Sequence, residues 1–332
     1  MATTNKVKTI GVLTSGGDAP GMNAAIRAAV RRGLQKGVQM KGILKGYDGL
    51  MNEEIIDMTA RDLSDTIERG GTILYTARCA EMRTLEGQKR AADVCRKHGI
   101  DGLVVIGGDG SFAGAQKLAA LGINTVGVPG TIDLDIACTE YTIGFDTAVN
   151  TAMEAIDKVR DTSTSHERCS IIEVMGRNAG YIALWCGIAN GAEDILLPEK
   201  YDYDEQKIIN NIIENRRKGK KHHIIVNAEG IGHSTSMARR IEAATGIETR
   251  ATILGHMQRG GSPCPYDRVL STRLGSEAAQ LILDKQYGYM VGMVNGKVKK
   301  IPLGECAGKL KTVDPNAQEV LQAKRMGISF GD

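Results

Sequence analysis

Strand-like apolar runs alternate with helix-like runs along almost the whole chain, and no other feature of the sequence limits the fold as strongly. The runs Thr9–Thr14 and Leu103–Ile106 are strand-like, and they lead into the helix-like stretches Met22–Lys36 and Gly114–Leu121. A chain that alternates in this way joins parallel strands through crossover helices, which then cover the sheet. We therefore predict an α/β protein with doubly wound, mostly parallel sheets and helices on both faces.

The remaining predicted elements continue the same order. Strands are predicted at 40–44, 125–128, 170–174, 195–197, 224–227 and 251–254, and helices at 88–97, 147–160, 179–189, 205–217, 237–244 and 271–284. Asn295-Gly296, between the alternating residues of 291–302, indicates a β-hairpin. A chain of 332 residues exceeds the size at which one core usually stops growing. We therefore predict two domains, 1–143 with 257–308 and 144–256 with 309–332.

Composition excludes several classes of protein. With 42% apolar and 24% charged residues the chain resembles an ordinary folded protein, and a net charge of +3 gives no global basic field for nucleic acid. The start of the chain has no signal-peptide layout, and no apolar run is long enough to cross a bilayer. The scattered cysteines, odd in number and without a CxxC, are typical of reduced thiols: Cys79, Cys95, Cys138, Cys169, Cys186, Cys264 and Cys306. We expect a soluble cytoplasmic protein.

Two glycine-rich or polar turns follow predicted strands that are separated by one helix. The first is Gly107–Ser111, which reads GGDGS, and the second is Gly130–Asp135, which reads GTIDLD. At the carboxyl ends of parallel strands, glycines let backbone amides approach a phosphate, and Asp109 supplies a hard oxygen ligand for Mg²⁺. Asp133 and Asp135 add two carboxylates. A single such turn is more often a plain tight turn, but the pair favours a phosphoryl-transfer site.

The first predicted strand also ends in a glycine-rich turn, Ser15–Asp18. This turn is either a further phosphate turn or a tight turn with an aspartate cap. Arg27 and Arg31 lie four residues apart on the following helix and share a face. The residues alone favour a solvated basic face there.

Cationic residues recur near the carboxyl ends of later strands. Arg177 follows one such strand, and His256 and Arg259 follow another. Guanidinium groups bind phosphate through paired hydrogen bonds, so this recurrence favours a sugar-phosphate pocket. His256 is either a general acid or base or a neutral hydrogen-bond donor. Glu229 is either an acceptor for sugar hydroxyls or a structural loop carboxylate.

Seven motifs in this order identify a family resemblance. They are GVLTSGGDAPGMNAAIR, VVIGGDGS, GTIDxD, YTIGF, RDTSTSHER, EVMGR and ATILGHMQRGGSPxPYDR. From about Ile10 to about Leu274 the chain resembles bacterial 6-phosphofructokinases, which are glycolytic, magnesium-dependent kinases of fructose 6-phosphate. The resemblance implies a homotetramer, an ATP-binding first domain and a fructose 6-phosphate-binding second domain.

The resemblance also implies a role for each matching position. Gly17, Arg78, Cys79, Gly108, Gly110 and Ser111 match ATP contacts, Asp109 matches the magnesium ligand, and Asp133 matches the base that takes the proton from the O1 hydroxyl. Asp135 and Thr131 match groups near the transferred phosphoryl, and Arg78 matches a residue that holds it. Ile132, Met175, Gly176, Arg177, Glu229, His256 and Arg259 match substrate contacts of the same subunit, with Arg177 also catalytic. Arg168 and Arg250 match substrate contacts from a neighbouring subunit.

A regulatory site is implied as well. Its matching positions are Arg27, Arg31, Arg160, Gly191, Glu193, Lys218, Lys220 and His222, where family members bind a nucleotide or phosphoenolpyruvate effector. This implication revises the solvated face suggested for the first two arginines.

One departure from the family keeps alternatives open. The family usually reads GTIDND, and this chain has Leu134 in place of the amide. Leucine either packs harmlessly there or misplaces the flanking carboxylates, and the second case would suit a non-catalytic regulatory paralogue. A pyrophosphate-dependent phosphotransferase is a further alternative, but those relatives carry an aspartate and a lysine where this chain has Gly110 and Gly130. We expect both glycines to leave room for a nucleotide. NAD kinases share the GGDG turn without the sugar-phosphate arginines.

Overall fold

The computed structural model describes residues 6–200 and 202–332, which form two compact units. Unit 1 contains the described residues up to Ile132, then 136–147 and 259–310, and unit 2 contains 133–135, 148–258 and 311–332. Our sequence-based boundaries kept residues 133–135 in the first domain, whereas in the structure they group with unit 2. The chain therefore changes unit within the GTIDLD motif.

Unit 1 is built around a seven-stranded sheet in the order β11-β10-β5-β4-β1-β2-β3. Its strands are β1 (Thr9–Ser15), β2 (Gln39–Ile43), β3 (Ile55–Met58), β4 (Gly102–Gly107), β5 (Thr125–Pro129), β10 (Tyr289–Val294) and β11 (Lys297–Pro302). The inner strands are parallel, and only the edge strands β3 and β11 run antiparallel to their neighbours. The carboxyl ends of β1, β4 and β5 therefore lie side by side at one edge of the sheet.

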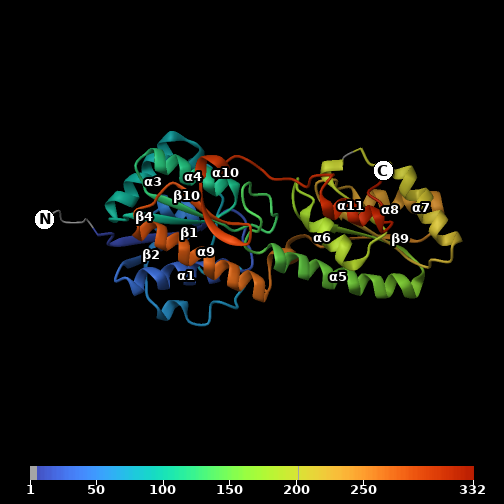
Figure 1. Ribbon diagram of the computed structural model, residues 1–332, viewed down its shortest axis with the longest axis horizontal. Helices are drawn as coiled ribbons and strands as arrows, with labels where there is room; N and C mark the ends of the chain where they lie inside the picture. The colour runs from blue at the N-terminus through green and yellow to red at the C-terminus, as the bar shows by residue number, and fades with distance from the viewer. Residues whose placement is uncertain (1–5, 201) are drawn as a thin grey trace. The chain divides into compact units, whose positions relative to one another are not determined.

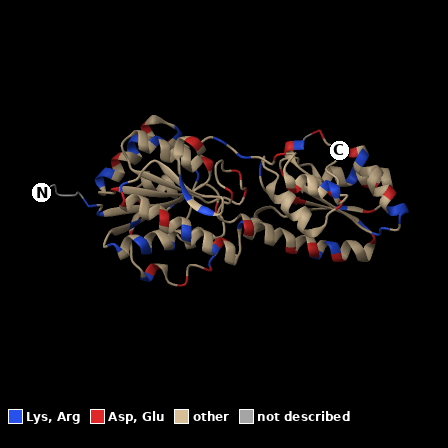
Figure 2. Ribbon diagram, viewed as in Figure 1, with Lys and Arg blue, Asp and Glu red and all other residues tan. Residues whose placement is uncertain are grey.

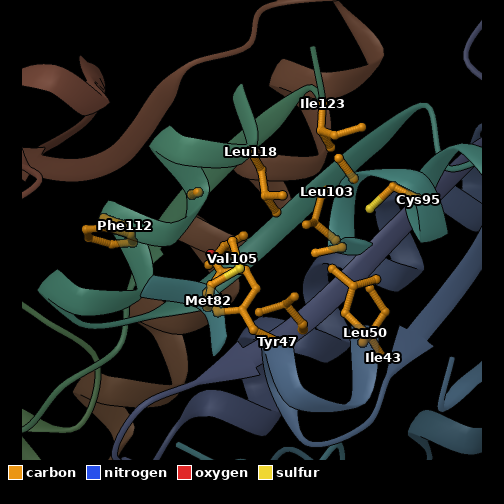
Figure 3. Packing of buried hydrophobic residues seen from close by; sticks show 14 of the residues in the cluster. Ile43, Tyr47, Leu50, Met82, Cys95, Leu103, Val105, Phe112, Leu118 and Ile123 are labelled. Carbon is orange, nitrogen blue, oxygen red and sulfur yellow. The ribbon is translucent and has the colours of Figure 1, made fainter. Parts of the chain in front are cut away.

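Helices cover both faces of this sheet (Figure 1). They are α1 (Met22–Gln35), α2 (Gly46–Met51), α3 (Leu85–Lys97), α4 (Asp109–Ala120), α9 (Pro265–Leu283) and α10 (Leu303–Cys306), with short 3₁₀ turns η1 (Arg61–Leu63) and η2 (Glu81–Arg83). Helices α1 and α9 pack together on one face. On the other face, alternate strand residues such as Leu103 and Val105 pack against Tyr47, Phe112 and Leu118 of the helices (Figure 3).

Unit 2 is built around a four-stranded, fully parallel sheet in the order β7-β8-β6-β9. Its strands are β6 (Cys169–Val174), β7 (Asp194–Leu196), β8 (His223–Ala228) and β9 (Thr249–Ile253). Its helices are α6 (Tyr181–Asn190), α7 (Glu205–Arg217), α8 (Ser234–Thr245) and α11 (Gln318–Arg325), with 3₁₀ turn η3 (Pro198–Lys200). Helices α7 and α8 bury Ile171 and Ile225 of the sheet, and α6 packs on Ile195 of the opposite face.

Helix α5 (Phe145–His166) starts in unit 1 and continues into unit 2, and 3₁₀ turn η4 (Gly255–Arg259) lies where the chain returns. The start of α5 is held by Asp267 of α9. The Asp267 carboxylate accepts hydrogen bonds from the backbone amides of Gly144 (2.9 Å) and Thr147 (2.8 Å). These amides belong to the group that a helix leaves unsatisfied at its start. Burial raises the pKa of Asp267.

The predicted α/β fold with mostly parallel sheets is confirmed, and so is the hairpin. Strands β10 and β11 pair antiparallel, and Asn295 (φ 51°) and Gly296 (φ 68°) both adopt the left-handed conformation that a type I′ turn needs. The prediction missed β3, α2, α10 and α11 and began α4 at Gly114, five residues late. Two glycines in its first part, Gly110 and Gly114, conceal the helix, because glycine has a low helix propensity.

Figure 2 shows acidic and basic residues interspersed on the helices of each unit. Within the part of the chain that the structure describes, no helix is both long and apolar enough to span a membrane.

Candidate active site

The first glycine turn follows β1 directly. Gly16 has φ +89°, a conformation that glycine adopts without steric cost, and its carbonyl accepts a hydrogen bond from the Thr76 hydroxyl at 2.8 Å. A Cβ on Gly17 would lie 2.6 Å from Nη1 of Arg259. The turn is thus held from two sides, by the segment around Thr76 and by the Arg259 guanidinium.

The GGDG turn joins β4 to α4. Gly107 is packed so closely that a Cβ would lie 2.3 Å from the Ser15 carbonyl oxygen and 2.4 Å from the Ser111 Oγ. Gly108 is the extended residue before the helix, and Asp109, Gly110 and Ser111 form the first helical turn. The Ser111 amide donates to the Gly108 carbonyl at 3.0 Å. The Asp109 and Gly110 amides at this helix start are therefore the ones available to an anion, which the helix dipole also favours.

Two hydrogen bonds fix the GGDG turn against its neighbours. The Ser111 hydroxyl donates to the Ser15 carbonyl at 2.9 Å, and the buried Tyr47 hydroxyl donates to the Ser111 carbonyl at 2.7 Å. The sequence analysis did not identify Tyr47, because it lies 64 residues from its partner in the sequence and belongs to no motif.

The two glycines expected to leave room for a nucleotide differ. A Cβ on Gly110 would meet nothing within 4 Å, so the space beside it is open. A Cβ on Gly130 would lie 3.0 Å from Cε of Met22 and 3.2 Å from Cγ2 of Ile106. The expectation was therefore wrong for Gly130, whose missing side chain leaves space that the protein itself fills.

Asp109 is half-buried at the start of α4. Its Oδ1 accepts a hydrogen bond from the Gly308 amide at 2.5 Å. The 303–310 segment, which the sequence analysis did not connect with the site, thus orients this carboxylate. A carboxylate beside free helix-start amides suits a hard divalent cation that is shared with phosphate oxygens.

Arg78 and Cys79 follow the segment that holds the first glycine turn. Arg78 is exposed and Cys79 is half-buried. Burial raises the pKa of the Cys79 thiol, so this group is a neutral contact at neutral pH.

The GTIDLD segment, which follows β5, is almost completely buried. Thr131, Ile132, Asp133 and Asp135 are 7%, 0%, 1% and 7% exposed. The Thr142 hydroxyl donates to the Thr131 carbonyl at 2.7 Å. Leu134 is 4% exposed and has φ +55°. It therefore packs in the interior, in a left-handed conformation that is unfavourable for leucine.

Asp133, Arg177 and Glu229 come together in unit 2. Nε of Arg177, which follows β6, lies 3.4 Å from Oδ2 of Asp133. Oε1 of Glu229, which follows β8, accepts hydrogen bonds from the amides of Gly176 (3.2 Å) and Arg177 (2.7 Å). The amide of the neighbouring Met175 donates to Oε1 of Gln258 at 3.3 Å. Five sequence-predicted residues thus gather at the carboxyl ends of β6 and β8.

Arg168 and Arg250 lie at the opposite edge of the same sheet, where β6 and β9 begin. Both bind Glu248, Arg168 through Nε at 2.7 Å and Arg250 through Nη2 at 2.6 Å. The Arg168 hydrogen bond is the main reason that the pKa of Glu248 is lowered. Within one chain these two arginines do not join the Asp133 cluster. The sequence analysis did not identify Glu248.

His256 and Arg259 lie in η4. His256 is exposed, whereas Arg259 is 9% exposed and its Nη1 donates to the Asp18 carbonyl at 3.0 Å. Arg259, predicted as a substrate contact, therefore lies against the first glycine turn of unit 1.

The predicted effector residues divide between the units. Arg27 and Arg31 line a groove of about 470 Å³ between α1 and α9 of unit 1. In unit 2, Lys220 pairs with Glu193, and Nη1 of Arg160 lies 3.4 Å from Nε2 of His222. Burial is the main reason that the pKa of His222 is lowered. Gly191 (φ 60°) ends α6 nearby in the sequence, and Lys218 instead pairs with Glu214.

Comparisons with known proteins agree on one family. The family described as Phosphofructokinase matches residues 9–282. An ATP-dependent 6-phosphofructokinase of Clostridium botulinum strain Hall is 55% identical over 314 residues, which are 95% of this chain and 98% of the relative. The ATP-dependent 6-phosphofructokinase of Halalkalibacterium halodurans is 56% identical over 308 residues, 93% of this chain and 96% of the relative.

Solved structures agree on the fold. A phosphofructokinase from Saccharomyces cerevisiae superposes with a TM-score of 0.82 at 33% identity, covering 96% of this chain and 46% of the yeast chain. A pyrophosphate-dependent phosphofructokinase from Marinobacter aquaeolei superposes with a TM-score of 0.86 at 21% identity, covering 97% of this chain and 92% of that chain. At that identity the second likeness concerns the fold alone.

Proposed function

Because the chain belongs to the phosphofructokinase family, we propose that it is the ATP-dependent 6-phosphofructokinase of glycolysis. It would transfer the γ-phosphoryl group of ATP to the O1 hydroxyl of fructose 6-phosphate, giving fructose 1,6-bisphosphate and ADP. The two relatives of 55% and 56% identity, both named ATP-dependent 6-phosphofructokinase, support the activity. The observation that carries the proposal is the buried Asp133 carboxylate facing the Arg177 guanidinium at 3.4 Å.

The nucleotide would bind to unit 1 through the glycine turns. Gly17, Gly108, Gly110 and Ser111 would contact the phosphates and ribose, and the α4 helix start would favour their negative charge. Arg78 and Cys79 would complete the contacts. Mg²⁺ bound with ATP would be held by Asp109 and would neutralise part of the phosphate charge.

The chemistry would depend on Asp133 and its surroundings. Asp133 would accept the proton of the O1 hydroxyl as its oxygen attacks the γ-phosphorus in line and the bond to the leaving ADP oxygen breaks. The Arg177 guanidinium would stabilise charge on the transferred group. Asp135 and Thr131 would orient that group, and the neighbouring Ile132 would contact the sugar. A positioned base contributes about 10²–10⁴ in rate.

Substrate binding would use unit 2, Arg259 of unit 1 and a neighbouring subunit. Met175, Gly176, Arg177, Glu229, His256 and Arg259 would contact fructose 6-phosphate from the same chain. Arg168 and Arg250, at the other edge of the sheet, would bind the substrate of a neighbouring subunit in a homotetramer. A solution mass that shows only monomer would contradict this shared site.

Regulation would use the predicted effector residues, with Arg27 and Arg31 of one subunit and the Arg160, Glu193, Lys220 and His222 cluster contributing. Gly191 and Lys218 belong to the same proposal. The ligand would be a nucleotide or phosphoenolpyruvate, because the side chains are mostly cationic. A cytoplasmic location is part of this proposal, since both substrates are metabolites of that compartment.

Two observations bear on the alternatives. The open space beside Gly110 favours a nucleotide over pyrophosphate as the phosphoryl donor. Leu134 is buried between two carboxylates that are both retained, which favours an active enzyme over a non-catalytic paralogue.

Initial rates with fructose 6-phosphate and Mg²⁺, measured with ATP or pyrophosphate, test the proposal. We expect fructose 1,6-bisphosphate to form with ATP and not with pyrophosphate. Turnover with pyrophosphate alone would contradict the donor. Intact binding of both substrates without turnover would make the regulatory paralogue the better account.

A further inference from the structure

The Glu229 carboxylate is engaged with the backbone of the turn that carries Arg177. Its Oε1 accepts both the Gly176 amide at 3.2 Å and the Arg177 amide at 2.7 Å. The family resemblance implies that Glu229 binds the sugar, whereas in the structure its carboxylate binds the protein backbone. The contact seen here acts on the catalytic arginine.

The Arg177 turn needs such an anchor because its backbone is unfavourable. Arg177 has φ +55° and the preceding Gly176 has φ +133°. A residue other than glycine in the left-handed region costs about 1–2 kcal/mol and persists where the surroundings hold it. Hydrogen bonds from two consecutive amides to one carboxylate oxygen are charge-assisted and supply that restraint.

Close packing adds to the restraint. A Cβ on Gly230, the residue after Glu229, would lie 2.4 Å from the Arg177 carbonyl oxygen. The amide of Glu229 also donates to the Val174 carbonyl at 2.8 Å. Residues 229–230 therefore lie against the backbone of the Arg177 turn, at both the amide and the carbonyl group of Arg177.

The Arg177 side chain is 62% exposed, whereas that of Asp133 is 2% exposed. Because few neighbouring residues surround the exposed guanidinium, its position over Asp133 depends on the conformation of the Arg177 backbone. We propose that Glu229 is a positioning residue for the reaction, which fixes the Arg177 backbone so that the guanidinium faces Asp133 and the transferred phosphoryl. This inference rests on the proposed function and gives Glu229 a second role beside sugar binding.

The two roles predict different kinetics. Loss of a sugar contact raises the KM for fructose 6-phosphate and leaves kcat largely unchanged. Loss of a positioning contact lowers kcat, and a displacement on the order of 1 Å costs about 10²-fold. We therefore expect Glu229→Ala to lower kcat by about 10²-fold, in addition to any rise in KM. Glu229→Gln keeps an oxygen that accepts both amides, so it recovers kcat to within about tenfold of wild type.

A double-mutant cycle tests whether Glu229 affects kcat through Arg177. If Glu229 acts through Arg177, Glu229→Ala causes no further fall in kcat when Arg177 is already alanine. Independent falls in kcat that multiply in the double variant would overturn the proposal. So would a wild-type kcat in Glu229→Ala.

Glu140 offers a matched control in unit 1. Its carboxylate also accepts two consecutive amides, those of Asn295 (2.6 Å) and Gly296 (3.1 Å). Glu140→Ala thus removes the same number of amide contacts from a turn of unit 1, and we expect its kcat to stay within about twofold of wild type, since only an exposed hairpin turn loses contacts. An equal fall in kcat in this control would overturn the proposal as a general effect of weakened structure.

Hydrogen exchange of the Arg177 amide separates this proposal from the proposed activity. Glu229→Ala should speed that exchange and Glu229→Gln should restore protection, in free enzyme and without turnover. Unchanged protection in Glu229→Ala would overturn the positioning role even in an active enzyme. If the Arg177 amide exchanges faster in Glu229→Ala but the wild-type protein forms no fructose 1,6-bisphosphate, the backbone contact is supported and the proposed function is overturned.

Discussion

The two units present groups of different kinds at the carboxyl ends of their strands. In unit 1 the carboxyl ends of β1 and β4 present backbone, because Gly17 and Gly107 let neighbouring protein atoms pack closely on the turns and Gly110 leaves open space beside the start of α4. In unit 2 the carboxyl ends of β6 and β8 present charged side chains, among them Arg177 and Glu229. The first arrangement suits a phosphate chain held by amides, and the second suits a small sugar phosphate held and activated by ionic groups.

The two regions should therefore tolerate different substitutions. A backbone site fails when a side chain is added, because Gly107 already has neighbours within 2.4 Å of a Cβ position. A side-chain site fails when one charge is removed, because its partner is left without compensation. Unit 2 also buries a hydrogen-bonded histidine–aspartate pair, so its stability should depend on polar side-chain partners more than that of unit 1.

The largest expected effect is on catalysis at the edge of unit 2. Asp133→Ser removes the proposed base, and kcat should fall by about 10²–10⁴-fold because the O1 proton loses its acceptor. Affinity for ATP, measured by calorimetry on the same variant, should remain near wild type, since the glycine turns are unchanged. Wild-type turnover in this variant would exclude Asp133 as the base.

The next largest effect concerns the stability of unit 2. Nε2 of His223 lies 2.5 Å from Oδ2 of Asp194, and their side chains are 5% and 0% exposed. His223→Ala leaves a buried carboxylate alone, which should lower the free energy of unfolding by about 3–5 kcal/mol. The double variant Asp194→Leu with His223→Leu should regain most of that loss in chemical denaturation. A double variant as unstable as the single one would contradict the charge-based explanation.

Unit 1 should respond to added volume instead. Gly107→Ala places a methyl group against Ser15 and Ser111, and the overpacking should cost about 1–3 kcal/mol of unfolding free energy. Gly110→Ala is the matched control, because its Cβ meets nothing within 4 Å and alanine favours the α4 helix by up to about 1 kcal/mol. This control should keep or raise the melting temperature and weaken ATP binding. Equal destabilisation by both substitutions would show that close packing is not the cause.

The smallest expected effect is pH-dependent and lies at the end of unit 2. Asp332 binds Lys200 at 2.5 Å and also pairs with Lys324. Burial alone would raise the pKa of Asp332, but the two lysines outweigh it and lower the pKa to about 2 from 3.8. The folded-state pKa is therefore below the unfolded value, so the carboxylate stabilises the fold above about pH 4 and loses that contribution as pH falls toward 2.

Asp332→Asn should accordingly cost about 1 kcal/mol near neutral pH, a value reduced by solvent screening of a half-exposed group. The difference from wild type in urea denaturation should disappear near pH 2. A difference that persists there would mean that packing, not charge, accounts for the loss.

The sequence predicted the fold and the motif positions well, because local patterns carry that information. Alternating apolar runs located the parallel strands, and glycine-rich turns marked their carboxyl ends. The contacts of Tyr47 with Ser111 and of Gly308 with Asp109 could not be predicted, since they join residues 64 and 199 positions apart and leave no local pattern. The contact of Glu248 with Arg168, 80 positions away, could not be predicted for the same reason. Gly130 shows a further limit: a glycine can make room for the protein's own side chains as well as for a ligand.

The most direct test of the division between the two regions is a crystal structure with Mg²⁺, a non-hydrolysable ATP analogue and fructose 6-phosphate. We predict that the triphosphate binds the amides around Gly108 and Gly110, and that the sugar O1 hydroxyl lies within hydrogen-bond distance of Asp133. Triphosphate bound by the charged residues of unit 2, with the sugar on the glycine turns, would contradict it.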